Sequence, residues 1–124
     1  MKYMKVLVCE DDEMIMKMVE YKMSREGYEV ILARNGKEAA EKIKTQDFDL
    51  IITDLLMPYM TGLELVNILR EKLGKKTPVI VLSKIGLEET VLKAFNMGAD
   101  DYMVKPFSPS ELSVRASRLL HKNK

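Results

Sequence analysis

The stretch of sequence that decides the fold runs from residue 48 to residue 58 and reads Phe48-Asp49-Leu50-Ile51-Ile52-Thr53-Asp54-Leu55-Leu56-Met57-Pro58. Residues 48–53 form a short apolar run with two isoleucines, a pattern that predicts a buried strand. Pro58 lacks an N–H and pushes the residue before it towards an extended conformation, so the chain must leave the sheet here. Asp54 stands where the strand ends. A charge in that place is unusual unless another group pairs with it.

The composition is that of a soluble globular protein. The chain has 124 residues, 47% of them apolar and 31% charged, which predicts a single domain over residues 1–124. A formal net charge of +1 gives no bulk field towards DNA or an anionic membrane, so neither is an expected partner of this domain. The apolar run at the amino terminus is too short for a signal peptide or a membrane span. Cys9 is the single cysteine, which excludes an internal disulfide and agrees with a cytoplasmic location.

Strand and helix patterns alternate five times along the chain. Strands are predicted at residues 5–9, 28–33, 48–53, 78–83 and 102–104. Helices are predicted from about residue 15 to Gly27, after the Asn35-Gly36 turn, at 62–73, at 87–97, and from the capping box Ser108-Pro109-Ser110-Glu111 onwards. This alternation favours right-handed βαβ units in an α/β fold, a doubly wound parallel sheet with helices on both faces.

Polar side chains stand at the carboxyl ends of four of the five predicted strands. In a parallel sheet these ends share one edge, where ligands bind. The residues are Glu10 and Asp11 after the first strand, Asp54 after the third, Ser83 at the end of the fourth and Lys105 after the fifth. We therefore expect three acids, a hydroxyl and a lysine to converge on one point.

That set of groups suits one kind of chemistry. Clustered carboxylates repel each other unless a cation neutralises them, and oxygen ligands without Cys or His suit a hard cation, Mg²⁺ best of all. A lysine and a hydroxyl beside the ion match the charged oxygens of a phosphoryl group in transfer.

Four segments carry a resemblance to a known family. They read Val8-Cys9-Glu10-Asp11-Asp12, Asp54-Leu55-Leu56-Met57-Pro58, Pro78-Val79-Ile80-Val81-Leu82-Ser83 and Gly98-Ala99-Asp100-Asp101-Tyr102-Met103-Val104-Lys105-Pro106-Phe107. With these motifs in order and at matching spacing, nearly the whole chain resembles a receiver domain of bacterial two-component response regulators, nearest to receivers of the winged-helix transcription-factor subfamily. The resemblance implies a flavodoxin-like (βα)5 fold with a five-stranded sheet in the order 2-1-3-4-5.

The resemblance implies that the chain is a phosphoacceptor switch and not an enzyme acting on other molecules; it would catalyse only its own phosphorylation and dephosphorylation. Asp54 is expected to accept a phosphoryl group from a sensor histidine kinase or a phosphotransfer protein. Lys105 is expected to pair first with Asp54 and then with a phosphoryl oxygen, and the Lys105–Pro106 bond is the expected place for a cis peptide. The expected Mg²⁺ ligands are Glu10, Asp11, Asp54 and the backbone carbonyl of Leu56.

The resemblance also implies how phosphorylation is read. Ser83 is expected to turn its hydroxyl inward to the phosphoryl group, and Tyr102 to rotate into the space vacated. The readout is expected on the face made by the fourth helix, the fifth strand and the fifth helix. That face could form a homodimer, since its charges match those of receivers that dimerise. The matching residues are Asp100, Asp101, Glu111 and Arg115; Val91 departs from the pattern, where a basic residue is usual.

Lys84 is a second departure, because the family usually has a small residue after the hydroxyl. A cation there could attract phosphoryl donors or hinder water that approaches Asp54. We predict that Lys84→Ala changes the lifetime of the phosphorylated state.

Some residues near the motifs are expected to have structural roles only. Asp12 is expected to cap the first helix, Cys9 to be an inert buried residue, and His121 to be solvated. Two alternative functions stay open: a receiver-like interaction module without phosphorylation, and an aspartyl-phosphate phosphohydrolase. The phosphohydrolases need a second Asp two residues after the nucleophile, where this chain has Leu56. The chain is either a stand-alone receiver or the amino-terminal piece of a longer regulator.

Overall fold

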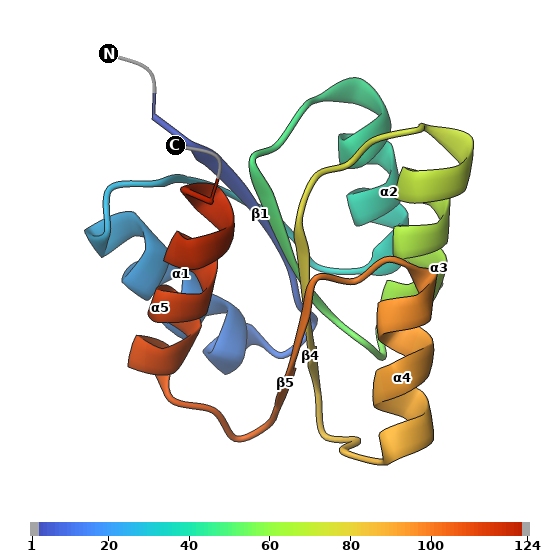
Figure 1. Ribbon diagram of the computed structural model, residues 1–124. Helices are drawn as coiled ribbons and strands as arrows, with labels where there is room; N and C mark the ends of the chain where they lie inside the picture. The colour runs from blue at the N-terminus through green and yellow to red at the C-terminus, as the bar shows by residue number, and fades with distance from the viewer. Residues whose placement is uncertain (1–2, 123–124) are drawn as a thin grey trace.

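The computed structural model describes residues 3–122, which form a five-stranded parallel sheet with helices on both faces (Figure 1). The strands are β1 Lys5–Cys9, β2 Glu29–Ala33, β3 Leu50–Asp54, β4 Val79–Ser83 and β5 Asp101–Val104. The helices are α1 Glu13–Arg25, α2 Gly36–Thr45, α3 Gly62–Asn67, α4 Glu88–Met97 and α5 Pro109–Leu120, with a π-helical turn, η1 Ile68–Lys72, after α3. The strand order β2-β1-β3-β4-β5 confirms the doubly wound α/β fold.

The third strand, β3, differs from its predicted bounds. It spans Leu50–Asp54 rather than residues 48–53, so Asp54 is the last residue of β3. Asp49 lies just outside the strand and makes two bonds to Lys5: its carboxylate accepts from the Lys5 backbone N–H at 2.7 Å, and its own N–H donates to the Lys5 carbonyl at 2.8 Å. Phe48, in the loop that leads into β3, is buried. The predicted third helix also differs, since its last turn widens into η1 and closes with an i to i−5 bond from Leu73 N to Ile68 O.

Two apolar cores separate the helices into layers. The alternating side chains of a strand point to opposite faces of the sheet, and every central strand here is buried on both. On one face α1 and α5 pack over Val8, Ile52 and Leu82. On the other face α2, α3 and α4 pack over Cys9, Ile51 and Val81, as Figure 1 shows. Cys9 is fully buried, as predicted, and burial raises the pKa of its thiol to about 12.

Side-chain caps start four of the five helices. The cap oxygens accept from the backbone N–H three residues on, and the pairs are Asp12 with Ile15, Asn35 with Glu38, Thr61 with Glu64 and Ser108 with Glu111. This confirms Asp12 as a cap and Ser108 as the start of α5. The amino terminus of α4 differs, because Leu87 stands in the cap position and offers no side-chain oxygen.

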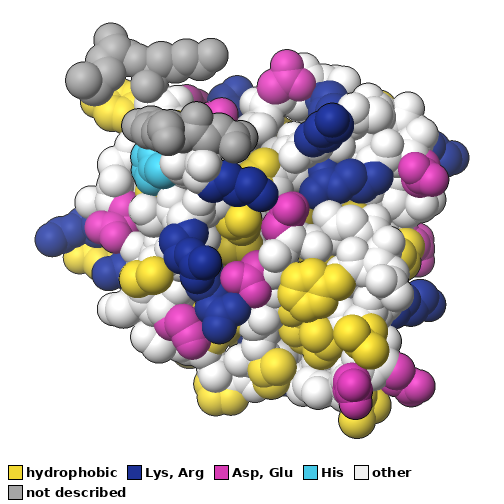
Figure 2. All heavy atoms as spheres, in the orientation of Figure 1, with side chains coloured by type: hydrophobic (Ala, Val, Ile, Leu, Met, Phe, Trp, Pro, Cys, Tyr) yellow, Lys and Arg dark blue, Asp and Glu magenta, His cyan; other side chains and the backbone are white. Residues whose placement is uncertain are grey.

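The α4 helix leaves much of its apolar surface exposed. Ala94 is its single fully buried side chain, whereas Leu92 and Phe95 are 53% and 41% exposed and Leu87, the residue before the helix, is 63% exposed. Hydrophobic side chains gather over α4 and β5 in Figure 2, beside a row of basic side chains over α5. None of the helices within residues 3–122 combines the length and the apolarity that crossing a bilayer requires.

Arg70 ties three segments together at the amino-terminal edge of the sheet. Its guanidinium donates to the Gly98 carbonyl at 2.8 and 3.2 Å, to the Lys75 carbonyl at 2.9 Å and to the Asp100 carboxylate at 3.1 Å. The same Asp100 oxygen accepts from Val79 N. Gly98 has φ +114°, and a Cβ there would come within 3.0 Å of the Arg70 side chain, so this corner requires glycine.

Candidate functional site

The register of the sheet brings the polar strand ends together. β1 and β3 are neighbours, with Cys9 opposite Thr53, so the next residues, Glu10 and Asp54, emerge side by side. β4 and β5 are neighbours, with Ser83 opposite Val104, and Lys105 follows directly. Lys105 N donates to the Ser83 carbonyl at 2.7 Å, which holds the lysine backbone at this edge. The Lys105–Pro106 peptide is cis, as predicted.

A buried ammonium lies between two buried carboxylates at the centre of this edge. Lys105 Nζ is 2.7 Å from Glu10 Oε1 and 3.2 Å from Asp54 Oδ1. The side chain of Lys105 is 7% exposed and that of Glu10 is fully buried. Charges so deeply buried are stable only when they are paired and hydrogen-bonded. The group that pairs with the Asp54 carboxylate is therefore Lys105, which also forms an ion pair with Glu10.

The burial of these groups shifts their protonation. Burial, followed by the nearby Asp54 carboxyl, raises the pKa of Glu10 to about 7, and Lys105 opposes that shift. Burial lowers the pKa of the Lys105 ammonium, but its bond to Glu10 and the charges of Glu10 and Asp54 outweigh burial and raise the pKa above its ordinary value. Lys105 thus stays charged while Glu10 sits near its titration point at neutral pH.

Asp54 is held in place by its own loop. Its Oδ1 accepts from Leu55 N at 2.9 Å, and Leu55 N also donates to Leu82 O at 2.8 Å. Gly62 then packs against the end of β3, since a Cβ on Gly62 would lie only 2.4 Å from the Asp54 carbonyl oxygen. The sequence predicted Gly62 merely as a helix start. A glycine at the first position of a helix is the signal that could have indicated this close approach.

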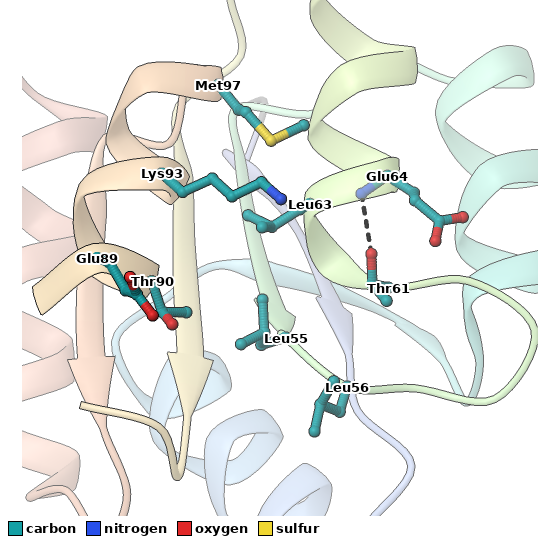
Figure 3. A pocket seen from close by; sticks show the side chains of 9 residues that line it. All are labelled: Leu55, Leu56, Thr61, Leu63, Glu64, Glu89, Thr90, Lys93 and Met97. Carbon is teal, nitrogen blue, oxygen red and sulfur yellow. Dashed lines mark hydrogen bonds between the residues drawn. The ribbon is translucent and has the colours of Figure 1, made fainter. Parts of the chain in front are cut away.

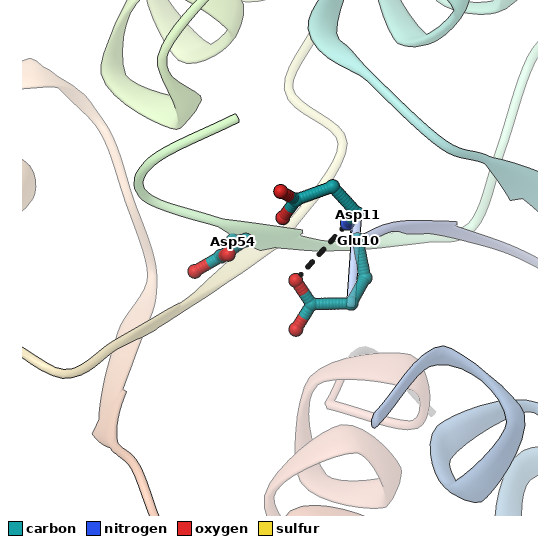
Figure 4. A group of neighbouring side chains, drawn as sticks. All are labelled: Glu10, Asp11 and Asp54. Carbon is teal, nitrogen blue, oxygen red and sulfur yellow. Dashed lines mark hydrogen bonds between the residues drawn. The ribbon is translucent and has the colours of Figure 1, made fainter. Parts of the chain in front are cut away.

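Three carboxylates form a cluster that could hold a cation. Ligand oxygens of Glu10, Asp11 and Asp54 all lie within 4.8 Å of one another. Figure 4 shows them on the adjacent ends of β1 and β3, with Asp11 N donating to Glu10 Oε2. Oxygen donors without nitrogen or sulfur fit a hard divalent cation such as Mg²⁺.

The cluster opens to solvent through a hollow of about 260 Å³. The lining residues are Asp11, Asp12, Asp54, Leu56, Ser83 and Lys84. Leu56 is 59% exposed at its rim, whereas Asp54 is only 8% exposed at its base. A small anion can therefore reach Asp54 from outside, while Glu10 and Lys105 close the inner side.

Ser83 and Tyr102 both form hydrogen bonds with the backbone of the same loop residue, Ile85. Ser83 is buried, and its Oγ accepts from Ile85 N at 2.9 Å. Tyr102 is buried too, and its hydroxyl donates to Ile85 O at 2.6 Å. The sequence singled out both side chains but missed Ile85, because its part is played by backbone atoms and leaves no side-chain signal. The side chain of Tyr102 therefore points into the protein in this structure rather than out into solvent.

A second hollow, of about 650 Å³, lies between α3 and α4. Figure 3 shows Lys93 reaching across it from α4, with Leu63 and Met97 nearby and Thr61 capping α3. The hollow contains Glu64 and Glu89 but neither Asp54 nor Lys105. Its polar groups are solvent-facing helix residues, so the chemistry of the molecule lies at the sheet edge.

Comparison with protein families agrees with this geometry. The family model of the response regulator receiver domain matches residues 6–117. Among curated relatives, the alkaline phosphatase synthesis transcriptional regulatory protein PhoP of Bacillus subtilis is 37% identical over 119 residues, covering 96% of this chain and 49% of PhoP. The transcriptional regulatory protein ResD of the same organism is 41% identical over 118 residues, covering 95% and 48%. The chain thus spans about half the length of these relatives.

Solved structures are similar over nearly the whole chain. The receiver domain of the Francisella response regulator 1452 superimposes with a TM-score of 0.92 and 40% identity, covering 97% of this chain and 98% of that one. The chemotaxis response regulator CheY4 of Vibrio cholerae gives a TM-score of 0.88 with 36% identity, covering 95% and 99%. The BeF3-activated receiver domain of DrrB gives 0.87 with 32% identity, covering 96% and 98%.

Proposed function

Since the chain belongs to the response regulator receiver domain family of two-component systems, we propose that it is a phosphoacceptor switch in which Asp54 carries the phosphoryl group. The observation that supports this most directly is the contact of Lys105 Nζ with Asp54 Oδ1 at the base of an open hollow. Glu10 cannot meet a donor because it is fully buried, and Asp11 is exposed and lacks the lysine. Residues 1–124 would constitute one receiver domain.

The reaction forms one bond and breaks another. A carboxylate oxygen of Asp54 attacks phosphorus in line, and the bond from phosphorus to the donor atom breaks with its electron pair. From phosphohistidine that pair leaves on the imidazole nitrogen, which takes its proton from solvent. Lys105, released from Asp54, then binds a phosphoryl oxygen and holds charge that develops in the transition state. The chain would catalyse only its own phosphorylation and dephosphorylation.

Glu10, Asp11, Asp54 and the backbone carbonyl of Leu56 are the groups proposed to hold Mg²⁺, in keeping with the oxygen cluster. When bound, the ion neutralises negative charge on the acids and on the phosphoryl oxygens. Glu10 suits this task because burial and Asp54 hold its pKa near 7, so a nearby cation would favour its ionised form.

The hydrogen bonds of Ser83 and Tyr102 to the Ile85 backbone are proposed to be the first to change on phosphorylation. A phosphoryl group adds roughly 1.5 to 2 negative charges and three acceptor oxygens, which compete for the Ser83 hydroxyl. Ser83 would turn from Ile85 N towards the phosphoryl group, and Tyr102, bonded to Ile85 O, would follow the loop. Reversing a two-state population from about 1:99 to 99:1 takes roughly 5.5 kcal/mol of differential binding, which Lys105, Ser83 and the cation would share.

The output face is proposed to be α4, β5 and α5, and the partner upstream a sensor histidine kinase or a phosphotransfer protein. A homodimer through this face would have to rearrange existing ion pairs. Arg115 already binds Asp101 at 2.8 Å and lies 3.9 Å from Glu111, while Asp100 is held by Arg70. The curated relatives are transcriptional regulators, so control of transcription by a longer protein is the proposed output.

Incubation with acetyl phosphate and Mg²⁺, followed by intact-mass spectrometry, tests the proposal. The wild type is expected to gain one phosphoryl group, and Asp54→Asn none. Asp12→Asn is the matched control, because Asp12 lines the same hollow and asparagine is an equally good helix cap; it is expected to gain the group.

Two other outcomes would support the alternatives. If the wild type gains no mass, the chain is an interaction module without phosphorylation. If inorganic phosphate is released over many rapid turnovers, it is a phosphohydrolase. Leu56 speaks against the latter, since the position two residues after Asp54 offers no side-chain acid.

A further inference from the structure

Lys84 is a second cation at the site and, unlike Lys105, it lines the open hollow. Lys105 occupies the inner side, 7% exposed and bound to Glu10 and Asp54. Lys84 is exposed and lines the open hollow above Asp54. Within residues 3–122, no carboxylate forms an ion pair with Lys84. Its charge is therefore available to a molecule that enters the hollow.

The geometry fixes where a donor's leaving group must go. Attack is in line, so the leaving atom departs on the side away from Asp54. The inner side is filled by Glu10 and Lys105, so the leaving atom must depart through the open hollow. Lys84 is the basic residue that lines this hollow. It is thus positioned to meet charge on the leaving group rather than on the phosphoryl oxygens.

We propose that Lys84 makes this site selective for acyl phosphate donors over phosphoramidate donors. The inference rests on the proposed phosphorylation of Asp54. With acetyl phosphate, the bond between phosphorus and the acyl oxygen breaks and its electron pair leaves on acetate, which departs as an anion. With phosphoramidate, the bond between phosphorus and nitrogen breaks, and the protonated nitrogen leaves as neutral ammonia. A cation at the exit stabilises the first transition state and not the second.

Charge also favours the approach of the donor. The acids Asp11, Asp12 and Asp54 line the hollow and repel an anion, and Lys84 is the exposed group that offsets them. This attraction acts on both donors according to their net charge, but the leaving-group effect acts on the acyl phosphate alone. The ratio of the two rates therefore isolates the leaving group from general attraction.

The experiment compares initial phosphorylation rates with acetyl phosphate and with phosphoramidate at saturating Mg²⁺, measured by intact-mass spectrometry. Lys84→Met removes the charge and keeps most of the bulk, and Lys84→Arg keeps the charge. Lys76→Met is the matched control, because Lys76 is an exposed lysine just before the other end of β4. For Lys84→Met the acetyl phosphate to phosphoramidate rate ratio is expected to fall about three- to fivefold, the size of an exposed charge interaction.

Lys84→Arg and Lys76→Met are expected to keep the wild-type ratio. The wild-type ratio should also fall between 0.1 and 1 M salt, as screening shortens from roughly 10 Å to 3 Å, whereas the ratio of Lys84→Met should not. An unchanged ratio in Lys84→Met, or the same loss in Lys84→Arg, overturns the inference while phosphorylation of the wild type still supports the switch. If the wild type accepts phosphoryl from neither donor, the proposed function fails and the selectivity with it.

Discussion

The two edges of the sheet each hold a cation, buried in one case and half-buried in the other, and the partners of the two cations differ. At the carboxyl edge, Lys105 is held by the carboxylates of Glu10 and Asp54, at 2.7 and 3.2 Å. At the amino edge, three of the four hydrogen bonds of Arg70 go to the backbone carbonyls of Gly98 and Lys75, and one goes to Asp100.

This difference distinguishes a reactive site from a purely structural contact. Carboxylates can be protonated, can bind a cation or can be phosphorylated, so the partners of Lys105 can change. Backbone carbonyls neither take up a proton near neutral pH nor accept a phosphoryl group. The planar guanidinium of Arg70 binds them in fixed directions. A cation held by several partners thus indicates chemistry when those partners are reactive, and a structural role when they are not.

Between the two cations, Lys105 is expected to have by far the larger effect on activity. Lys105→Met deprives the phosphoryl group of a charged donor, which should slow phosphorylation by acetyl phosphate about 100-fold or more. Stopped-time mass spectrometry measures the rate. Lys75→Met is the control, since Lys75 also has an ion pair and two carbonyl partners but lies away from the site. A Lys105→Met rate within a few-fold of the wild type would contradict the role of Lys105.

Removing Arg70 should affect stability instead. Arg70→Met leaves the carbonyls of Gly98 and Lys75 and the Asp100 carboxylate without this donor, which should lower the free energy of unfolding by about 2 to 4 kcal/mol. Urea denaturation measures the loss. Arg25→Met, at an exposed position on α1, should change stability little. A phosphorylation rate reduced as strongly as in Lys105→Met would show that the two edges are not separate in function.

The pH dependence of stability should come from the carboxyl edge. Because the pKa of Glu10 rises from its ordinary 4.5 to about 7 on folding, the folded protein binds more protons than the unfolded chain between these values. Its free energy of unfolding, without Mg²⁺, should therefore fall by about 2 to 3 kcal/mol as the pH rises from 4.5 to 7. Denaturation at several pH values measures this slope. Glu10→Gln should abolish it, and a slope that persists in this variant would sink the assignment.

The smallest expected effect concerns the lifetime of the phosphorylated state. Lys84→Ala removes a side chain that lines the hollow above Asp54, so water should reach the acyl phosphate more easily. The half-life is expected to shorten about twofold, in keeping with the modest size of exposed interactions. Loss of phosphoryl mass after removal of the donor provides the measurement. An identical decay rate for Lys84→Ala and the wild type would refute the prediction.

Much of the fold could be predicted from local pattern. Apolar strand runs and the Asp12 and Ser108 caps are present as expected. The cis Lys105–Pro106 bond, expected from the family resemblance, is present too. Boundaries were less accurate: β3 begins at Leu50, and Asp49 before it is bound to the Lys5 backbone, a contact between distant segments. The strand order came from the family resemblance, since alternation alone does not order parallel strands.

For the site, the sequence by itself determined which groups stand at strand ends, because the chemistry of a residue and its place in a strand are local properties. It therefore placed Asp54, Glu10, Asp11, Ser83 and Lys105 at one edge. The tertiary structure alone decided which atoms meet. Lys105 reaches Glu10 across 95 residues of sequence, and Ser83 and Tyr102 both bind the backbone of Ile85. Such contacts depend on strand order and register, which bring together residues whose local patterns carry no information about each other.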